Sequence, residues 1–151
     1  MRLLPRSWLD AARDTSGASA VEFALVFPIL LVILFSIIKF GIAFNNYLEL
    51  TDSVRVGVRQ LAIDRSSSTP YTDSRSAVFS SAANLTQANI TVTLSVSNTV
   101  CGSDGACATA LSAAQGAASK VSATYPCDLT IMGVNFAPGC TLTSSTTERV
   151  E

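Results

Sequence analysis

An apolar stretch near the N-terminus limits what this chain can fold into more than any other feature does. From Phe23 to Ile38 the sequence reads FALVFPILLVILFSII, interrupted by one proline and one serine, and apolar residues continue past Glu22 back to Ala18. A helix of this extent has roughly 20 residues and a length of about 30 Å, the hydrocarbon thickness of a bilayer. The sequence therefore predicts one transmembrane helix, to which we assign residues 18–44.

Pro28 lies inside the predicted transmembrane helix. Proline removes a backbone donor and bends a helix or melts it locally, which lipid tolerates only where neighbouring groups satisfy the freed carbonyl. We therefore expect a mobile joint at Pro28.

Charged residues ahead of the apolar stretch predict its orientation. Arg2, Arg6 and Arg13 precede it, and Asp10 and Asp14 count little under the positive-inside rule. The N-terminus is therefore expected in the cytoplasm and everything after the span on the other side of the membrane, in an oxidising environment where disulfides persist. We thus predict a single-pass membrane protein.

A cleavable signal peptide is an alternative interpretation, because it also has a basic start and an apolar stretch. Its cleavage site would follow the apolar stretch, where the one weak match is Gly41-Ile42-Ala43, with bulky Phe44 next to it. The apolar stretch is also already long for the h-region of a signal peptide. These features favour a retained anchor.

Composition and charge exclude several classes of function. Charged residues make up 14% of the chain, the formal net charge is −1 and histidine is absent. Nucleic-acid binding requires a basic surface, which scattered basic residues on a near-neutral chain do not supply. The lack of histidine removes the commonest general base and metal ligand. We therefore predict no nucleic-acid partner, no metal, no cofactor and no catalytic residues.

A carboxylate lies inside the apolar helix, in the segment Gly17-Ala18-Ser19-Ala20-Val21-Glu22. A charge within a membrane helix is costly and usually functional. Cleavage after Gly17 would make Ala18 a positively charged N-terminus, four residues from Glu22 and on the same helix face. When subunits pack together, Glu22 of one chain can neutralise the Ala18 amine of another and offset the desolvation of both charges. Glu22 is thus predicted to be an assembly carboxylate.

An ordinary signal anchor is the simpler interpretation of these residues. In that case Glu22 reaches to the membrane interface and Gly17 is a loop residue. The position of the glycine is more informative than the bare motif, because it lies at the cytoplasmic border of the span after a short charged leader. That is where a prepilin peptidase would cut, which favours a processed subunit with a leader of residues 1–17.

Three features together resemble the TadE-like family of minor pseudopilins. They are the run GASAVEFALVFP from Gly17 to Pro28, the later Gly41, and the Arg-x-Gly-x-Arg pattern at residues 55–59. The resemblance covers residues 17–63.

The resemblance implies a role in the biogenesis of tight-adherence (Flp-type IV) pili. With the orientation above, we expect a single-pass protein of the bacterial inner membrane, with the N-terminus in the cytoplasm and the C-terminal domain in the periplasm. The resemblance also implies contacts with other pilins and pseudopilins, and processing by a dedicated prepilin peptidase. By the same resemblance Gly17 precedes the cut, Ala18 is the mature N-terminus and Glu22 is the assembly carboxylate.

Residues 45–63 are expected to continue the same helix, because apolar residues recur there at helical spacings with polar residues between them. Arg55 and Arg59 are four residues apart, and Asp52 lies one turn before Arg55. A local salt bridge between Asp52 and Arg55 explains this pattern simply. The alternative is a contact surface for a partner pseudopilin, formed by Arg55, Gly57 and Arg59.

Residues 64–151 are predicted to form a small extracytoplasmic domain. A loop is expected at residues 66–70, which are rich in serine, threonine and proline. A short helix should follow, with Thr72 or Asp73 as its N-cap.

The remainder of this domain is predicted to be a small antiparallel sheet. Residues 90–97 alternate strictly between apolar and hydroxyl side chains, the period of a strand with one buried face. Residues 121–125 and 141–150 are expected to supply two further strands. With the long helix packed on this sheet, the fold class is α+β.

Four cysteines follow the span, and their even number in a small periplasmic domain predicts disulfides with three possible connectivities. Short segments rich in Gly, Pro or Asp separate Cys101 from Cys107 and Cys127 from Cys140, which favours the pairs 101–107 and 127–140. The spacings do not match a zinc site, and Cys-x-x-Cys does not occur. Catalytic thiol chemistry is disfavoured, since there is no histidine to activate a thiol.

The sequence as a whole favours a non-enzymatic, pilin-like subunit. Its segments are a cytoplasmic leader (1–17), a transmembrane helix in inner-membrane lipid (18–44), a helix extension (45–63) and an outer α+β domain (64–151). After assembly such a subunit would lie in the extracellular pilus. The alternative hypothesis is an uncleaved, signal-anchored envelope protein whose outer domain binds a ligand or partner.

Overall fold

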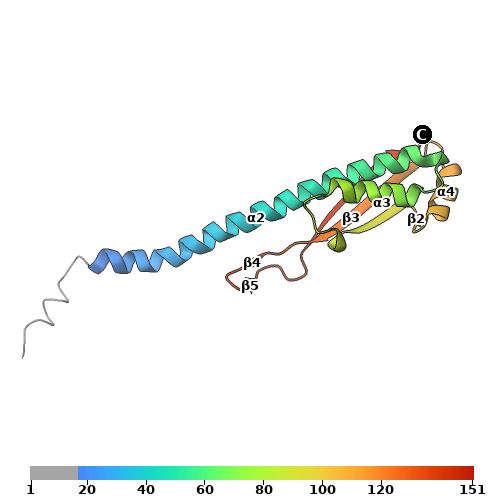
Figure 1. Ribbon diagram of the computed structural model, residues 1–151. Coiled ribbons are helices and arrows are strands. Elements are labelled where there is room, and N and C mark those ends of the chain that lie inside the picture. Colours follow the sequence, from blue (N-terminus) through green and yellow to red (C-terminus); the bar gives the residue numbers. More distant parts are fainter. Residues whose placement is uncertain (1–16) are drawn as a thin grey trace, which may run out of the picture. The chain divides into compact units, whose positions relative to one another are not determined.

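The computed structural model describes residues 17–151, and the chain divides into two compact units between Ile38 and Lys39. One long helix, α2 (Ala18–Ile63), contributes to both units (Figure 1). It ends where the sequence predicts the end of the helix extension. The boundary between the units precedes residue 44, the expected end of the transmembrane segment.

The first unit, among the described residues, consists of the apolar part of helix α2. This helix is long and apolar enough to cross a membrane, and none of its most apolar window is buried by the rest of the protein. The Ser36 hydroxyl donates a 2.7 Å hydrogen bond to the carbonyl of Val32, so it has a partner within the apolar stretch. The helix continues through Pro28 without a break, so the local melting that we considered there is not found. The bend and the mobile joint expected at Pro28 stay predictions.

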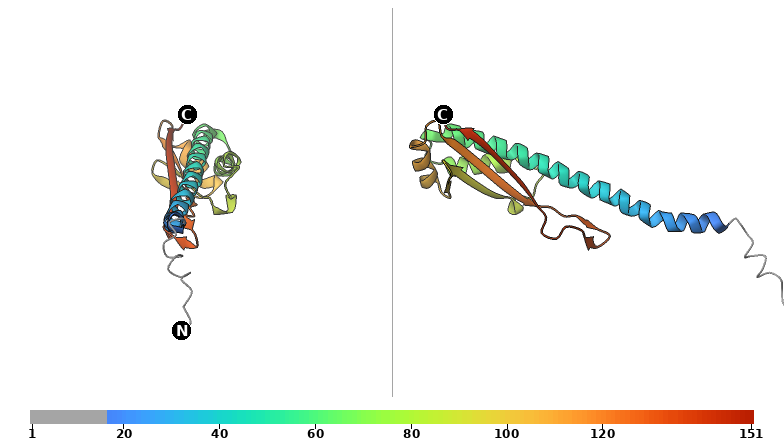
Figure 2. Two further views of the ribbon diagram at one scale, coloured as in Figure 1. Left: turned by 90° about the vertical axis from the view of Figure 1, so that its left-hand side faces the viewer. Right: turned by 180° about the vertical axis from the view of Figure 1, so that it is seen from behind.

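The second unit is built around a four-stranded antiparallel sheet with the strand order β2-β1-β3-β6 (Figure 2). Leu94 of β1 lies opposite Val121 of β3, which in turn lies opposite Thr146 of β6. Together with the long helix and the disulfides, this sheet confirms the predicted α+β fold class. The strands are β1 (Thr91–Val96), β2 (Thr99–Cys101), β3 (Ala118–Pro126) and β6 (Thr141–Arg149).

One continuous apolar core joins helix α2, helix α3 (Pro70–Ser81) and the sheet. The part of α2 after Lys39 turns one apolar face inward, because its buried residues recur every three or four positions. Each fully buried Leu or Val stabilises the fold by about 1.5–3 kcal/mol relative to exposure. The contributing side chains include Leu50, Val54, Val58 and Leu61 from α2, Val78 from α3, and Leu94, Val121 and Ala123 from the sheet.

Helix α3 begins earlier than predicted. Pro70 lies in its first turn, so neither Thr72 nor Asp73 is its N-cap; Thr69 holds that position and makes no side-chain capping hydrogen bond. Proline suits the first turn because its fixed φ is helical and its missing N–H would have no helical partner there.

The sequence prediction omitted three features of the second unit. Strand β2 follows β1 through a tight turn, and the helix α4 (Asp104–Ser112) begins at a Ser103 cap whose Oγ accepts a hydrogen bond from the Ala106 N–H. A separate hairpin pairs β4 (Thr130–Ile131) with β5 (Val134–Asn135). The strands that were predicted correspond to β1, β3 and β6.

Both disulfides favoured by the cysteine spacing are present. Cys101–Cys107 joins β2 to α4, with the Cα atoms 5.1 Å apart, and Cys127–Cys140 closes the neck of the β4–β5 hairpin, with the Cα atoms 5.3 Å apart. In the chain-entropy model, a closed loop of about 15 residues stabilises by roughly 3 kcal/mol. That contribution is substantial for a domain with a core this small.

Candidate assembly and membrane-anchoring site

The N-terminal motif lies at the start of helix α2, in the first unit. Gly17 precedes the helix, Ala18 is its first residue and Glu22 follows within the second turn. All three residues are exposed. Because residues four apart share a helix face, Ala18 and Glu22 lie one above the other. The rest of the predicted leader, residues 1–16, lies outside the described residues.

The helix that carries this motif presents an extensive apolar surface. Leu25 is 70% exposed and Ile37 is 65% exposed. Phe23 and Phe27 contact one another, with ring centroids 5.2 Å apart. An exposed apolar surface of this extent marks an interaction with lipid or with other apolar helices.

Two of the three residues predicted to contact a partner are exposed. Arg55 forms a 3.2 Å ion pair with Asp52, which is the local salt bridge that we considered. Both side chains are exposed, so the pair contributes only about 0–1 kcal/mol. Arg59 is exposed and lines a shallow groove with Glu148 and Glu151. It therefore remains available for an outside contact.

Gly57 is buried beneath helix α3, which corrects its assignment to a partner surface. The Ser74 hydroxyl donates a 2.8 Å hydrogen bond to the Gly57 carbonyl. A Cβ on Gly57 would collide with Cγ2 of Val78 and lie 3.3 Å from the Ser74 carbonyl oxygen. Only glycine permits this close approach of the two helices. The role of Gly57 is therefore inside the domain.

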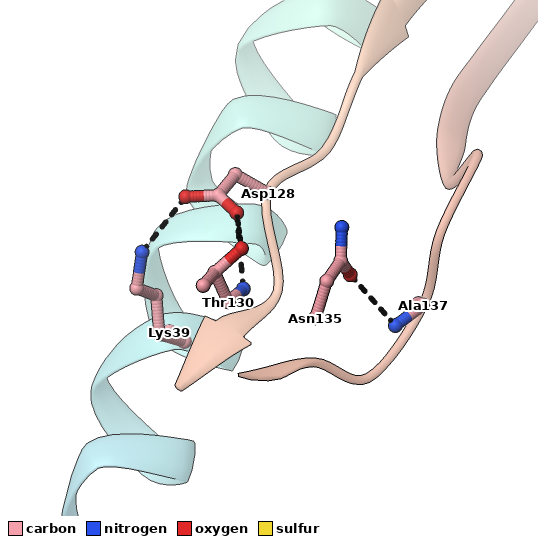
Figure 3. A network of polar contacts seen from close by, with 5 residues as sticks. All are labelled: Lys39, Asp128, Thr130, Asn135 and Ala137. Atoms are coloured by element: carbon pink, nitrogen blue, oxygen red, sulfur yellow. Dashed lines mark hydrogen bonds and ion pairs between the residues drawn. The ribbon is translucent and has the colours of Figure 1, made fainter. Parts of the chain in front are cut away.

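A polar network at the base of the β4–β5 hairpin is a feature that sequence reasoning missed (Figure 3). Lys39 Nζ donates to Asp128 Oδ2 at 2.9 Å, and the N–H and hydroxyl of Thr130 donate to Asp128 Oδ1 at 3.0 and 2.5 Å. Further along the hairpin, the Ala137 N–H donates a 3.0 Å hydrogen bond to Asn135 Oδ1. Lys39 and Asp128 are 89 residues apart in the chain, so no local pattern relates them.

The network lowers the pKa of Asp128, and this shift can be measured. Hydrogen bonds from the Thr130 hydroxyl and then from Lys39 lower the pKa of Asp128 from 3.8 to about 2. Because the pKa is lowered, the contribution of this contact to stability is complete above about pH 4 and is lost as the pH falls toward 2. We expect the Asp128 carboxyl, followed by NMR in the full-length protein in micelles, to titrate near pH 2.

The variant Thr130→Val removes the largest cause of this pKa shift. In that variant the pKa of Asp128 should move back toward 3.8 while the ion pair to Lys39 remains. A wild-type pKa near 3.8 would contradict the network.

An apolar groove lies beside this network, between helix α2 and the neck of the hairpin in the second unit. Its lining is almost entirely apolar. The helix contributes Phe40, Ala43, Phe44 and Tyr47, and the hairpin and its flanking strand contribute Cys127, Leu129, Cys140 and Leu142.

Among residues 17–151, no group of three or more His, Cys, Asp or Glu side chains is arranged to hold a metal ion. All four cysteines in this part of the chain are in disulfides. The site residues described above can act by charge pairing and by apolar packing.

A single exposed apolar helix joined to a small disulfide-bonded α+β domain is the architecture of a membrane-anchored protein. Residues 17–59 match the family model for TadE-like proteins, which confirms the resemblance predicted from the sequence. No significant match was found among the curated proteins or the solved structures.

The family match bears on function in general terms. TadE-like pilus proteins are structural proteins, and the match supports a minor-pilin role related to the Tad pilus and interaction with other pilus components. The match covers Gly17 and helix α2 as far as Arg59, so the sheet and the hairpin lie outside it.

Proposed function

We propose that this chain is a TadE-like minor pseudopilin, an assembly subunit of a tight-adherence pilus that prepilin peptidase processes after Gly17. The observation that carries the proposal is a carboxylate, Glu22, inside the exposed apolar part of helix α2, in the segment that matches the TadE-like family. Its partners are other pilins and pseudopilins, the peptidase and inner-membrane lipid.

In this proposal residues 18–44 span the inner membrane, with the N-terminus in the cytoplasm and the outer domain in the periplasm. The arginines ahead of the span support this orientation. The two disulfides after the span also support it, because disulfides persist in the periplasm and not in the cytoplasm.

Assembly then consists of exchanging lipid around the apolar helix for the helices of other subunits. Packing of apolar surfaces supplies little preference for one register over another. A charge pair between the Ala18 amine of one subunit and Glu22 of the next does fix the register, since any other register leaves both charges without a partner in apolar surroundings.

The mature N-terminus tests the processing step. In a host that expresses the pilus system's prepilin peptidase, mass spectrometry of the purified protein should find a chain that begins at Ala18. The same gene in a host without that peptidase should give a chain that begins at Met1. Gly17→Leu should retain the leader in the first host, and Ser16→Ala, its matched control, should not.

Two outcomes would contradict the proposal. A chain that begins at Met1 in the host with the peptidase would leave an uncleaved signal-anchored envelope protein as the better hypothesis. A chain that begins near Phe44 would indicate a cleaved signal peptide.

A further inference from the structure

The β4–β5 hairpin exposes apolar side chains that do not belong to the apolar core of the domain. No charged residue occurs between Asp128 and Cys140. At the tip of the hairpin, Met132 is 66% exposed, Val134 58% and Phe136 63%. These three exposed apolar side chains lie within residues 132–136, and we call them together the hairpin tip.

The turn of this hairpin retains an apolar residue where the backbone disfavours one. Met132 and Gly133 both have positive φ (49° and 84°), a conformation that Asn, Asp or Gly adopts more readily than Met. The turn between β1 and β2 also has two positive φ values, 51° and 66°, and there the residues are the polar Ser97 and Asn98. A turn with two positive φ values is thus formed by polar residues elsewhere in the same protein. The backbone conformation therefore does not explain an apolar residue at position 132.

The hairpin is held at one defined place in the second unit. The Cys127–Cys140 disulfide closes its neck, and the Cys127 N–H donates a 3.1 Å hydrogen bond to the Cys140 carbonyl. The ion pair from Asp128 to Lys39 fastens it to the first turn of α2 in this unit. The hairpin projects away from the four-stranded sheet (Figure 1).

Lys39 directly follows the apolar stretch that ends at Ile38. A lysine at the end of a membrane helix extends its amine to the headgroups while its stem stays in apolar surroundings. Lys39 lies near the periplasmic end of the proposed span, residues 18–44, so its amine reaches the periplasmic headgroups. The base of the hairpin, which is paired with that amine through Asp128, then lies at the headgroups too. Met132 is four residues beyond Asp128, a reach of about 13 Å at roughly 3.3 Å per residue.

We propose that the hairpin tip inserts into the periplasmic leaflet of the membrane that helix α2 spans. Met132, Val134 and Phe136 would lie at the boundary between headgroups and acyl chains, the depth at which apolar faces of interfacial segments bury about 5–10 Å. This inference rests on the proposed membrane span. The apolar groove lined by Phe40 and Phe44 continues the lipid contact from the helix to the hairpin.

Lipid is favoured over a second copy of the chain because the span itself brings the bilayer to Lys39, whether or not any other subunit is present. The hairpin also lacks charged groups that would have to be desolvated at this depth, since Asp128 is paired at the neck. The tip gives the periplasmic domain a second attachment to the membrane beside the helix.

Tryptophan fluorescence of the full-length chain tests the insertion. All variants carry Trp8→Phe, so that each introduced tryptophan is the single one. Met132→Trp and Phe136→Trp report on the tip, Ser97→Trp is the control at the matching position of the other turn, and Ile33→Trp reports on the span. One chain per nanodisc is used, with phosphatidylethanolamine and phosphatidylglycerol plus a phosphatidylcholine brominated near the top of its acyl chains.

The expected result is a blue-shifted emission at both tip positions and loss of most of that emission with the brominated lipid. Ser97→Trp should emit as in water and should not be quenched. If both tip tryptophans are quenched no more than Ser97→Trp while Ile33→Trp is blue-shifted and quenched, the span stands and the insertion is overturned. An Ile33→Trp emission typical of water would overturn the span and the insertion together.

A third arm, with two chains per nanodisc, separates lipid from protein. A tip emission that shifts to the blue only when the second chain is present, without quenching by lipid, would assign the tip to a second copy and overturn insertion. A shift and quenching that are equal in both kinds of disc would support lipid as the occupant.

Discussion

Glu22→Ala is expected to abolish incorporation of the subunit into the pilus while leaving its membrane insertion and its cleavage after Gly17 intact. The substitution leaves the Ala18 amine of the neighbouring subunit charged and without a partner in apolar surroundings. Breaking a buried ion pair in this way costs on the order of 3–5 kcal/mol. Because about 1.4 kcal/mol is tenfold in affinity, association should weaken by more than about a hundredfold.

The measurement is the amount of subunit in the sheared pilus fraction, or bound to the other pseudopilins after extraction, relative to its amount in the membrane. Glu22→Gln keeps the size of the side chain without its charge and should fail like Glu22→Ala. Asp52→Ala removes an exposed carboxylate from the same helix and should assemble normally. Normal assembly of Glu22→Ala would instead favour a plain anchor, which gains stability when a charge leaves its membrane helix.

Gly57→Ala is expected to destabilise the outer domain by about 1–3 kcal/mol, the usual cost of overpacking a core. The new Cβ collides with Val78, whose branched side chain has few alternative rotamers, and it presses on the backbone of Ser74. The collision opposes the gain of up to about 1 kcal/mol that alanine brings to a helix interior. Denaturant unfolding of the full-length protein in micelles, followed by near-UV circular dichroism, gives the free energy of unfolding.

Gly41→Ala is the matched control, because Gly41 lies on the same helix with nothing within 4 Å of the added Cβ. It should be neutral or stabilising by up to about 1 kcal/mol. A double-mutant cycle with Val78→Ala then tests the cause, since the paired substitution should cost less than the sum of the single ones. Equal effects of alanine at the two glycines would show that Gly57 is not a packing residue.

The elements predicted correctly are those whose sequence period is long enough to recognise. Strict alternation over residues 90–97 predicts β1, and helical spacing after Phe40 predicts the continuation of α2 to Ile63. Hairpin β4–β5 was missed because Thr130–Ile131 and Val134–Asn135 are too short to show a period of two. Met132 also occupies a turn position where Asn or Gly is the usual signal.

Helix α4 was missed for a different reason. Gly102 and Asp104 follow Cys101 closely, and the segment between Cys101 and Cys107 was used only as a short stretch that a disulfide could close. The signal for a helix was nonetheless present, since Ser103 precedes the alanine-rich run DGACATALS and is a favourable N-cap.

The residues of the candidate site likewise differ in whether the sequence alone predicts their arrangement. Gly17, Ala18 and Glu22 are close in the chain, so their arrangement at the helix start follows from the sequence. The contact between Lys39 and Asp128 depends on tertiary structure that no local pattern contains. The same is true of Gly57, because the sequence could not say whether this glycine faces a partner or the chain's own helix α3.

The connectivity of the disulfides bears on how the domain is made. Each bond joins two cysteines that are consecutive in the chain, with separations of 6 and 13 residues. If the outer domain crosses the membrane from its N-terminal side, each cysteine meets its correct partner as the next thiol to arrive. An oxidant that pairs thiols in order of arrival produces the native bonds directly, and no thiol–disulfide isomerase is needed to rearrange them.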